Sequence, residues 1–263
     1  MMSSVLPTIS RRFLRIWRRN LTVYWKTWPV SFIPPLLEPV FYLLAFGVGL
    51  SALIGKIQYQ GIELSYMRFI APALIAITIM YNAFFENTYG SFVRMYYQKT
   101  FDGMMATPLF LEEIITGEIV WGMTKSVIAA SIMMAVISAF GLMTYPQALM
   151  ILLVAVVGGF AFGSLGMFFT GVIPHIEIFN LPIFLFITPM FLFGGTFFPI
   201  ENLPAWAQKV ALALPLTHLV LLVRSFAYGI IRVEHLWSLA YLALFTIVFF
   251  PLALVVMHRR LIK

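Results

Sequence analysis

Three charged side chains lie inside apolar runs of this sequence, where an ionisable group is costly and therefore often functional. Glu38 lies near the start of the first apolar run, Glu86 near the end of the second, and Lys125 about one turn into the third. A carboxylate at membrane depth could couple transport to an ion gradient. All three are expected close to one membrane surface, however, where snorkelling or mutual pairing explains them equally well.

No enzyme motif accompanies these charges. The sequence contains no G-x-x-x-x-G-K-[ST] phosphate loop and no H-E-x-x-H zinc motif. Its four histidines are scattered without the spacing of metal ligands. The segment FGSLG at 162–166 carries Phe162 where a nucleophile elbow requires glycine. We therefore expect no catalytic residue, no cofactor-binding residue and no metal site in this chain.

The composition predicts that membrane helices position these charges. Of 263 residues, 62% are hydrophobic and 10% are charged, whereas soluble domains contain about 45–50% apolar and about 25% charged residues. The net charge is +7, but the basic residues cluster at the two ends of the chain, as topology determinants do. The expected fold is an all-α polytopic membrane protein, and nucleic-acid binding is a poor explanation of the charge.

The apolar windows predict six transmembrane helices, because about 20 apolar residues are needed to cross a bilayer. These spans are 31–54, 68–90, 119–141, 147–173, 178–200 and 237–257. A seventh apolar stretch, 205–231, contains Lys209 and Arg224, and a charge at a helix centre costs about 2.5–3.5 kcal/mol on insertion scales. We therefore predict a broken, re-entrant extracytoplasmic segment over 201–236, within a single membrane domain that covers 1–263.

The basic residues also predict the topology. Six spans leave both termini on the same side, and both termini are rich in arginine and lysine. The positive-inside rule then places both termini and the loop 91–118 in the cytoplasm. A seventh span would export the basic C-terminal sequence HRRLIK.

Residues 8–28 are predicted to form an amphipathic helix in the cytoplasmic interface. Apolar residues recur there at steps of three and four, with arginines between them. Such a helix places tryptophans among the lipid headgroups and arginines toward anionic lipid. The alternative is a basic flank that only orients the first span.

The segment QKTFDGMMATPLFLEEIITGE, residues 98–118, predicts a short helix at the cytoplasmic surface. Asp102 can cap it, and the pair Thr107-Pro108 interrupts it. We expect Glu112, Glu113 and Glu118 to face away from its apolar side chains. Because acids are unfavourable beside an anionic leaflet, docking of a protein partner explains the segment better than a lipid-surface helix.

The segment 193–224 predicts broken helices on the outer side. The double glycine at 194–195 loosens the end of the fifth span, and Pro199, Pro204 and Pro215 prevent a regular helix. Broken helices at membrane depth are tolerated where they are buried in protein or line a cavity. A constriction and a packed extracytoplasmic cap are both compatible with this pattern.

Gly159 and Gly163 lie four residues apart on one face of the fourth predicted span. Small residues at this spacing allow two helix backbones to approach closely. The pattern fits packing within the chain, and it also fits a dimer contact.

Several stretches together resemble the ABC type-2 transporter permease family, and most of all its nodulation-factor exporter branch, which exports a lipo-oligosaccharide with a separate ATPase. The matching stretches are KTFDGMMATP and EEIITGEIVWGMTK within 99–125, FGSLGMFFT at 162–170, and ITPMFLFGGTFFPIENLP with LPLTHLVLLVR within 187–224. With the ending HRRLIK, the resemblance extends over nearly the whole chain.

The resemblance implies that the loop after the second span holds a coupling helix that docks on the ATPase. Its candidate contacts are Lys99, Phe101, Asp102, Met105, Thr107 and Pro108. ATP and Mg would be bound by the partner ATPase and not by this chain. The candidates for an outer gate or translocation path are Phe197, Phe198, Pro199, Pro215 and His218.

The resemblance further implies a permease homodimer with two ATPase subunits in the inner membrane. Such a complex would export a lipo-oligosaccharide, a polysaccharide or an amphipathic drug-like substrate by alternating access. The alternative function is a secondary transporter driven by an ion gradient. Its typical features, midplane carboxylates and paired broken helices in two related halves, are missing from the sequence.

Overall fold

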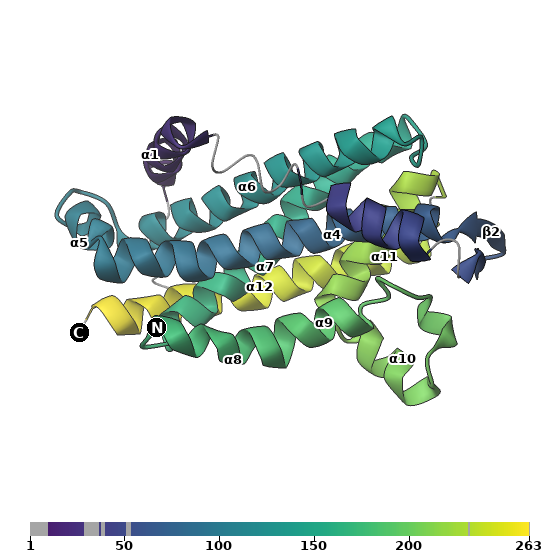
Figure 1. Cartoon of the computed structure of the whole chain (residues 1–263). Coiled ribbons are helices and arrows are strands. Elements are labelled where there is room, and N and C mark those ends of the chain that lie inside the picture. The colour runs from purple at the N-terminus through teal and green to yellow at the C-terminus, as the bar shows by residue number, and fades with distance from the viewer. Residues whose placement is uncertain (1–9, 29–36, 38–39, 51–53, 231, 263) are drawn as a thin grey trace.

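The computed structural model describes residues 10–28, 37, 40–50, 54–230 and 232–262. Within them, long helices run side by side in an elongated bundle (Figure 1). One end of this bundle, which we call the α5 end, holds α5 (Thr100–Met105) and the C-terminal end of α12 (Glu234–Leu261), with α1 (Phe13–Lys26) close by. The hairpin end, opposite to it, holds a β-hairpin and α10 (Figure 1).

Among the described residues, five helical segments are long and apolar enough to cross a membrane. They are Tyr66–Tyr97, Leu111–Ala139, Gln147–Val172, Ile176–Phe193 and Glu234–Leu261. The pair α10 (Ala205–Leu212) and α11 (Pro215–Tyr228) meets the same test as one unit bent by 85°. The protein is therefore an all-α polytopic membrane protein, as its composition predicted.

The centre of the bundle is α7 (Ile151–Val172), which packs most extensively against three long helices. These are α4 (Tyr66–Phe85), α6 (Leu111–Ala139) and α12 (Glu234–Leu261). Glycines bring the helices close together. A Cβ added at Gly159 would lie 2.2 Å from the Ser126 Oγ of α6, and one added at Gly163 would lie 3.0 Å from the Asn87 Nδ2. The glycine face thus packs within the chain, the first of the two alternatives.

Residues 31–36, 38–39 and 51–53 of the first predicted span, 31–54, lie outside the described residues. Its described part includes a π-helix, η3 (Leu43–Leu50). An antiparallel hairpin of β1 (Lys56–Tyr59) and β2 (Ile62–Ser65) follows. The sequence analysis did not predict this hairpin, although its two-residue turn, Gln60-Gly61, has positive φ at both positions, as such hairpins require.

Two helices extend beyond the spans predicted from hydropathy. The helix that begins with α4 continues through the π-helical segments η4 (Glu86–Gly90) and η5 (Val93–Tyr97). α6 already begins at Leu111. The added turns carry charged residues, which a hydropathy window counts against a span. Much of the predicted loop 91–118 is therefore helical.

The segment after the fifth span is broken, as its prolines predicted. η7 (Ile176–Phe179), α8 (Asn180–Pro182), η8 (Ile183–Ile187) and α9 (Thr188–Phe193) form that span. The chain then turns at Gly195, which has a φ of +70°. Pro204 precedes α10, and Pro215 is the first residue of α11.

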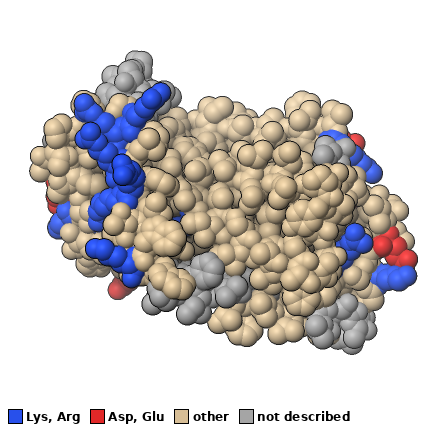
Figure 2. All heavy atoms as spheres, turned by 90° about the horizontal axis from the view of Figure 1, so that it is seen from above, with Lys and Arg blue, Asp and Glu red and all other residues tan. Residues whose placement is uncertain are grey.

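α1 (Phe13–Lys26) is amphipathic, as predicted. Ile16 is buried against the bundle, whereas Arg11, Arg15 and Arg18 are exposed. Lys and Arg side chains gather over α1 on the surface seen in Figure 2. This basic face suits a helix that lies on an anionic membrane surface.

Candidate functional site

α5 (Thr100–Met105) is a short helix at the α5 end, held by turns on both sides (Figure 1). Lys99, just before it, has a left-handed backbone with φ of 52°, which turns the chain sharply after Tyr97. After α5, the Thr107 Oγ1 donates to the Met104 carbonyl at 2.6 Å. These turns present the predicted docking residues at the tip of the molecule.

The structure brings five of the six predicted docking residues to the surface of α5 and its flanking turns. Lys99, Asp102, Thr107 and Pro108 are exposed, and Met105 is partly exposed. Phe101 differs, because its ring is completely buried in the apolar cluster at the α5 end. As an apolar side chain on the inner face of α5, Phe101 anchors the helix and offers no surface to a partner.

Polar contacts join the turn after α5 to the N-terminal segment. The Arg12 Nη1 donates to the Pro108 carbonyl at 2.8 Å. The Ser10 backbone N–H donates to the Glu113 Oε1 at 3.2 Å, while the Phe110 N–H donates to the Glu113 Oε2 at 3.0 Å. The predicted docking segment is therefore connected to α1 as well as to the bundle.

The three acids after this turn belong to α6 and are buried. The sequence analysis expected them to form the polar face of the short helix, and this expectation was wrong. Glu113 and Glu118 are fully buried, and Glu112 is 6% exposed. The Glu112 Oε1 lies 3.3 Å from the His258 Nδ1 near the C-terminal end of α12. α6 starts earlier than predicted because these carboxylates are paired inside the protein.

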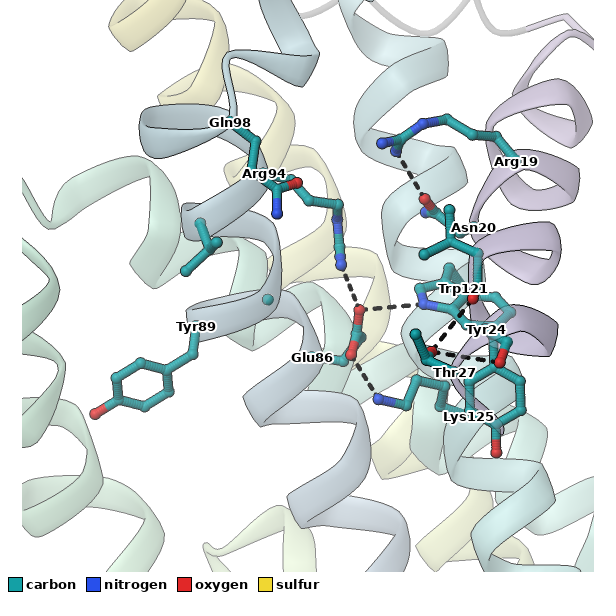
Figure 3. Close-up of a pocket in the computed structure, with 13 residues that line it drawn as sticks. Arg19, Asn20, Tyr24, Thr27, Glu86, Tyr89, Arg94, Gln98, Trp121 and Lys125 are labelled. Atoms are coloured by element: carbon teal, nitrogen blue, oxygen red, sulfur yellow. Dashed lines mark hydrogen bonds and ion pairs between the residues drawn. The ribbon is translucent and has the colours of Figure 1, made fainter. Parts of the chain in front are cut away.

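Glu86 and Lys125, two of the three predicted intramembrane charges, form an ion pair. The Lys125 Nζ lies 2.8 Å from the Glu86 Oε2. The Arg94 Nη1 lies 2.7 Å from the Glu86 Oε1, to which the Trp121 Nε1 donates at 3.1 Å (Figure 3). Mutual pairing thus explains these charges. Glu38 lies outside the described residues.

Glu118 joins three segments that are far apart in the sequence. Its Oε2 accepts from the Arg94 Nε and the Ser91 Oγ at 2.8 and 2.9 Å. Its Oε1 accepts from the Asn20 Nδ2 of α1 at 2.9 Å. We call Glu86, Arg94, Glu118 and Lys125 the charge network. It joins the extension of α4, which precedes α5 in the chain, to α6, which follows α5. The hydrogen bond from Asn20 adds α1 to this contact.

The predicted outer-gate residues lie in two separate packing environments. Phe197 packs on Phe46 and Phe191, with ring centroids 5.4 and 5.0 Å apart. His218 stacks on Tyr241 at 4.1 Å and contacts the Leu212 carbonyl through its Nε2 at 2.9 Å.

The other outer-gate candidates differ in burial. Phe198 is partly buried, whereas Pro199 and Pro215 are buried. No described pocket brings the five candidates together. Their role in a gate stays a prediction.

Sequence reasoning missed the role of Arg224, which is 1% exposed. Its guanidinium donates to the carbonyls of Gly195, Thr196 and Phe69 at 2.7, 3.0 and 3.3 Å. It also lies 3.8 Å from the centroid of the Phe69 ring. Arg224 thereby fixes the turn after α9 to the first turns of α4. A charged residue inside an apolar stretch was the sequence signal for this buried role. The sequence analysis used it only as an argument against a seventh membrane span.

The described residues contain no group of three His, Asp or Glu side chains that could hold a metal ion. The charged side chains of the charge network form ion pairs between the extension of α4 and α6.

Comparison with known proteins gives a consistent family assignment. Residues 11–228 match the ABC-2 type transporter family. Nodulation protein J of Sinorhizobium fredii strain NGR234 is 34% identical over 222 residues, which are 84% of this chain and 83% of that protein. Nodulation protein J of Rhizobium leguminosarum bv. trifolii is 33% identical over 260 residues, which are 99% and 98% of the two chains.

A more distant similarity connects the chain to a protein of Escherichia coli strain K12, the inner membrane transport permease YadH. It is 25% identical over 224 residues, which are 83% of this chain and 82% of that protein. The range matched by the family includes α1, α5 and the whole charge network.

Proposed function

This chain belongs to the ABC-2 type transporter family, and we propose that it is the membrane-spanning permease subunit of an exporter driven by a separate ATP-binding-cassette ATPase. ATP and Mg bind to that ATPase. The permease has no phosphate loop in its sequence and provides the translocation path. Two permease chains and two ATPase chains form the working complex. It lies in the inner membrane, with both termini of each permease chain on the cytoplasmic side.

The arrangement of α5 is the observation that carries this proposal. Its exposed residues, Lys99 and Asp102 among them, lie at the tip of the molecule, while Phe101 anchors the helix in the apolar cluster. A helix that is exposed outward and anchored inward can receive a partner and pass its movement to the bundle.

The charge network supplies the path for that movement. α5 lies between the extension of α4 and the start of α6, and the ion pair of Arg94 with Glu118 joins these two helices directly. When ATP closes the ATPase pair, displacement of α5 moves both helices together, and the permease pair opens outward. The same contacts count against an ion-coupled secondary transporter, because Glu86 is held between Arg94 and Lys125.

The leading candidate for the cargo is a lipo-oligosaccharide. The similarity to Nodulation protein J over 98–99% of both chains supports this class. A polysaccharide and an amphipathic drug-like molecule are the other members of the proposed class. Transport assays with each would separate them.

Co-purification with the ATPase tests this function. Tagged permease is co-expressed with a candidate ATP-binding-cassette ATPase from the same organism, and ATP turnover of the purified complex is measured in liposomes. We expect stoichiometric co-purification and an ATPase rate that changes when the permease is present. A permease that purifies alone and carries proton- or sodium-dependent flux would overturn the proposal.

A further inference from the structure

A pocket of about 420 Å³ opens at the α5 end between α1, the extension of α4 and α6 (Figure 3). Its volume lies within the range of about 300–1,000 Å³ that is typical of small-molecule sites. The charged side chains that line it are Arg19, Glu86, Arg94 and Lys125. The proposed transport cycle uses the ion pairs in the wall of this pocket but assigns no ligand to its open space.

The charges around this pocket are unbalanced. Arg94 and Lys125 both pair with Glu86. Arg94 also pairs with Glu118, which is buried and does not line the pocket. Arg19 extends from α1 into the same region (Figure 3), but its Nη1 donates to the neutral amide oxygen of Asn20 at 3.0 Å. Three cations therefore face two carboxylates among the described residues here, and one positive charge is left over.

Arg19 is the cation whose environment is least favourable. Burial lowers the pKa of Arg19 from its ordinary value, Glu118 raises it, and the like charge of Arg94 lowers it again. A partly buried cation beside another cation is stabilised by a bound anion.

The remaining walls are suited to an amphipathic molecule. Tyr24 and Trp121 line the pocket as an edge-to-face pair, with ring centroids 5.6 Å apart. Val23 adds an aliphatic surface, and Thr27 and Gln98 add polar groups. A ligand with a charged group next to carbon-rich parts would find a complementary surface for each.

We propose that this pocket binds the phosphodiester headgroup of an anionic glycerophospholipid, with Arg19 as its principal anion contact. A phosphodiester carries a single negative charge, which balances the charge left over. The amphipathic α1 places the pocket at the depth of lipid headgroups, and basic pockets between membrane helices are known binding sites for anionic headgroups. The lipid would bridge α1 to the charge network. This inference requires α1 at the membrane surface and does not depend on the ATPase or the cargo.

The test measures which lipid the full-length protein retains. Wild type, Arg19→Gln and the control Arg18→Gln are equilibrated with equal amounts of phosphatidylglycerol and phosphatidylethanolamine, and bound lipid is counted by native mass spectrometry. Arg18 is the matched control, because it is exposed on the same helix and loses the same charge. We expect wild type and Arg18→Gln to prefer phosphatidylglycerol, and Arg19→Gln to bind it about tenfold more weakly.

Two further measurements make the result decisive. Arg19→Lys keeps the charge and should retain most of the preference, which a purely structural role of Arg19 would not explain. Inorganic phosphate at millimolar concentration should not displace the lipid. Displacement would show a general phosphate site and overturn the lipid assignment. Equal retention of both lipids by wild type, or equal loss in Arg18→Gln and Arg19→Gln, would overturn the whole inference.

Discussion

Arg94 and Glu118, 24 residues apart in the sequence, are joined by two hydrogen bonds to one carboxylate oxygen. The Nε and Nη2 of Arg94 both donate to the Glu118 Oε2, the first at 2.8 Å. The pair connects the helix that enters α5 with the helix that leaves it. Because Glu118 is fully buried, this contact closes the base of the α5 segment away from water.

Breaking this pair should destabilise the protein strongly. In Arg94→Gln, Glu118 and Glu86 lose a cation inside the protein, and loss of one partner of a buried ion pair costs about 3–5 kcal/mol. We expect a clear fall in the melting temperature of the purified protein in detergent.

The hairpin provides the control for Arg94→Gln. Lys56 and Glu63 pair at 3.0 Å with side chains that are 70% and 52% exposed, and such surface pairs contribute about 1 kcal/mol or less. Lys56→Gln should therefore change the melting temperature little. Equal shifts for the two variants would show that the buried pair has no special role.

Charge reversal at Asp102 should weaken ATPase docking without unfolding the permease. Asp102 is exposed on α5 and makes no ion pair with the described residues. We expect Asp102→Arg to insert normally and to retain much less ATPase in a pull-down.

Glu63→Arg, a reversal at the hairpin end of the bundle, is the matched control for Asp102→Arg. It should co-purify with the ATPase as wild type does. Unchanged association of Asp102→Arg would exclude this face of α5 as the docking site.

A methyl group at Gly117 should push α1 away from α6. A Cβ there would lie 2.7 Å from the Ile16 Cβ and 2.9 Å from the Phe13 carbonyl oxygen. Because backbone atoms cannot move aside easily, we expect Gly117→Ala to cost about 1–3 kcal/mol, measured as a lower melting temperature.

Gly103→Ala is the control for Gly117→Ala, because we expect it not to lower the stability of the protein. Gly103 lies in α5 with nothing within 4 Å of an added Cβ, so Gly103→Ala should be neutral or stabilise by about 0.5–1 kcal/mol. A Gly117→Ala protein as stable as Gly103→Ala would contradict the close packing of α1.

Arg224→Lys should destabilise the turn after α9 even though the charge is kept. An ammonium group is a compact donor that cannot reproduce the guanidinium fork toward the carbonyls of Phe69, Gly195 and Thr196. Each lost charge-assisted hydrogen bond contributes about 1.5–3 kcal/mol. Thermal unfolding in detergent measures the loss.

Arg68→Lys is the control for Arg224→Lys, because Arg68 is exposed and adjacent to Phe69 in the sequence. It should unfold at the same temperature as wild type. A wild-type melting temperature for Arg224→Lys would show that the three carbonyl contacts are dispensable.

The properties that could be predicted from the sequence are the local ones. Composition predicted the membrane class, the periodicity around Ile16 predicted the amphipathic α1, and Pro199, Pro204 and Pro215 predicted the breaks after the fifth span. Each of these follows from neighbouring residues, through the hydropathy of a window, the period of a helix, or the missing N–H of proline.

Which residues contact one another depends on how the helices pack. Asn20 and Glu118 are 98 residues apart, and Glu86 and Lys125 are 39 apart, so no window contains either pair. For the same reason the sequence analysis misplaced the start of α6 and could not show that Phe101 is buried. A charge in an apolar run lowers the score of a span until its partner is known, and that partner is brought close only when the helices pack.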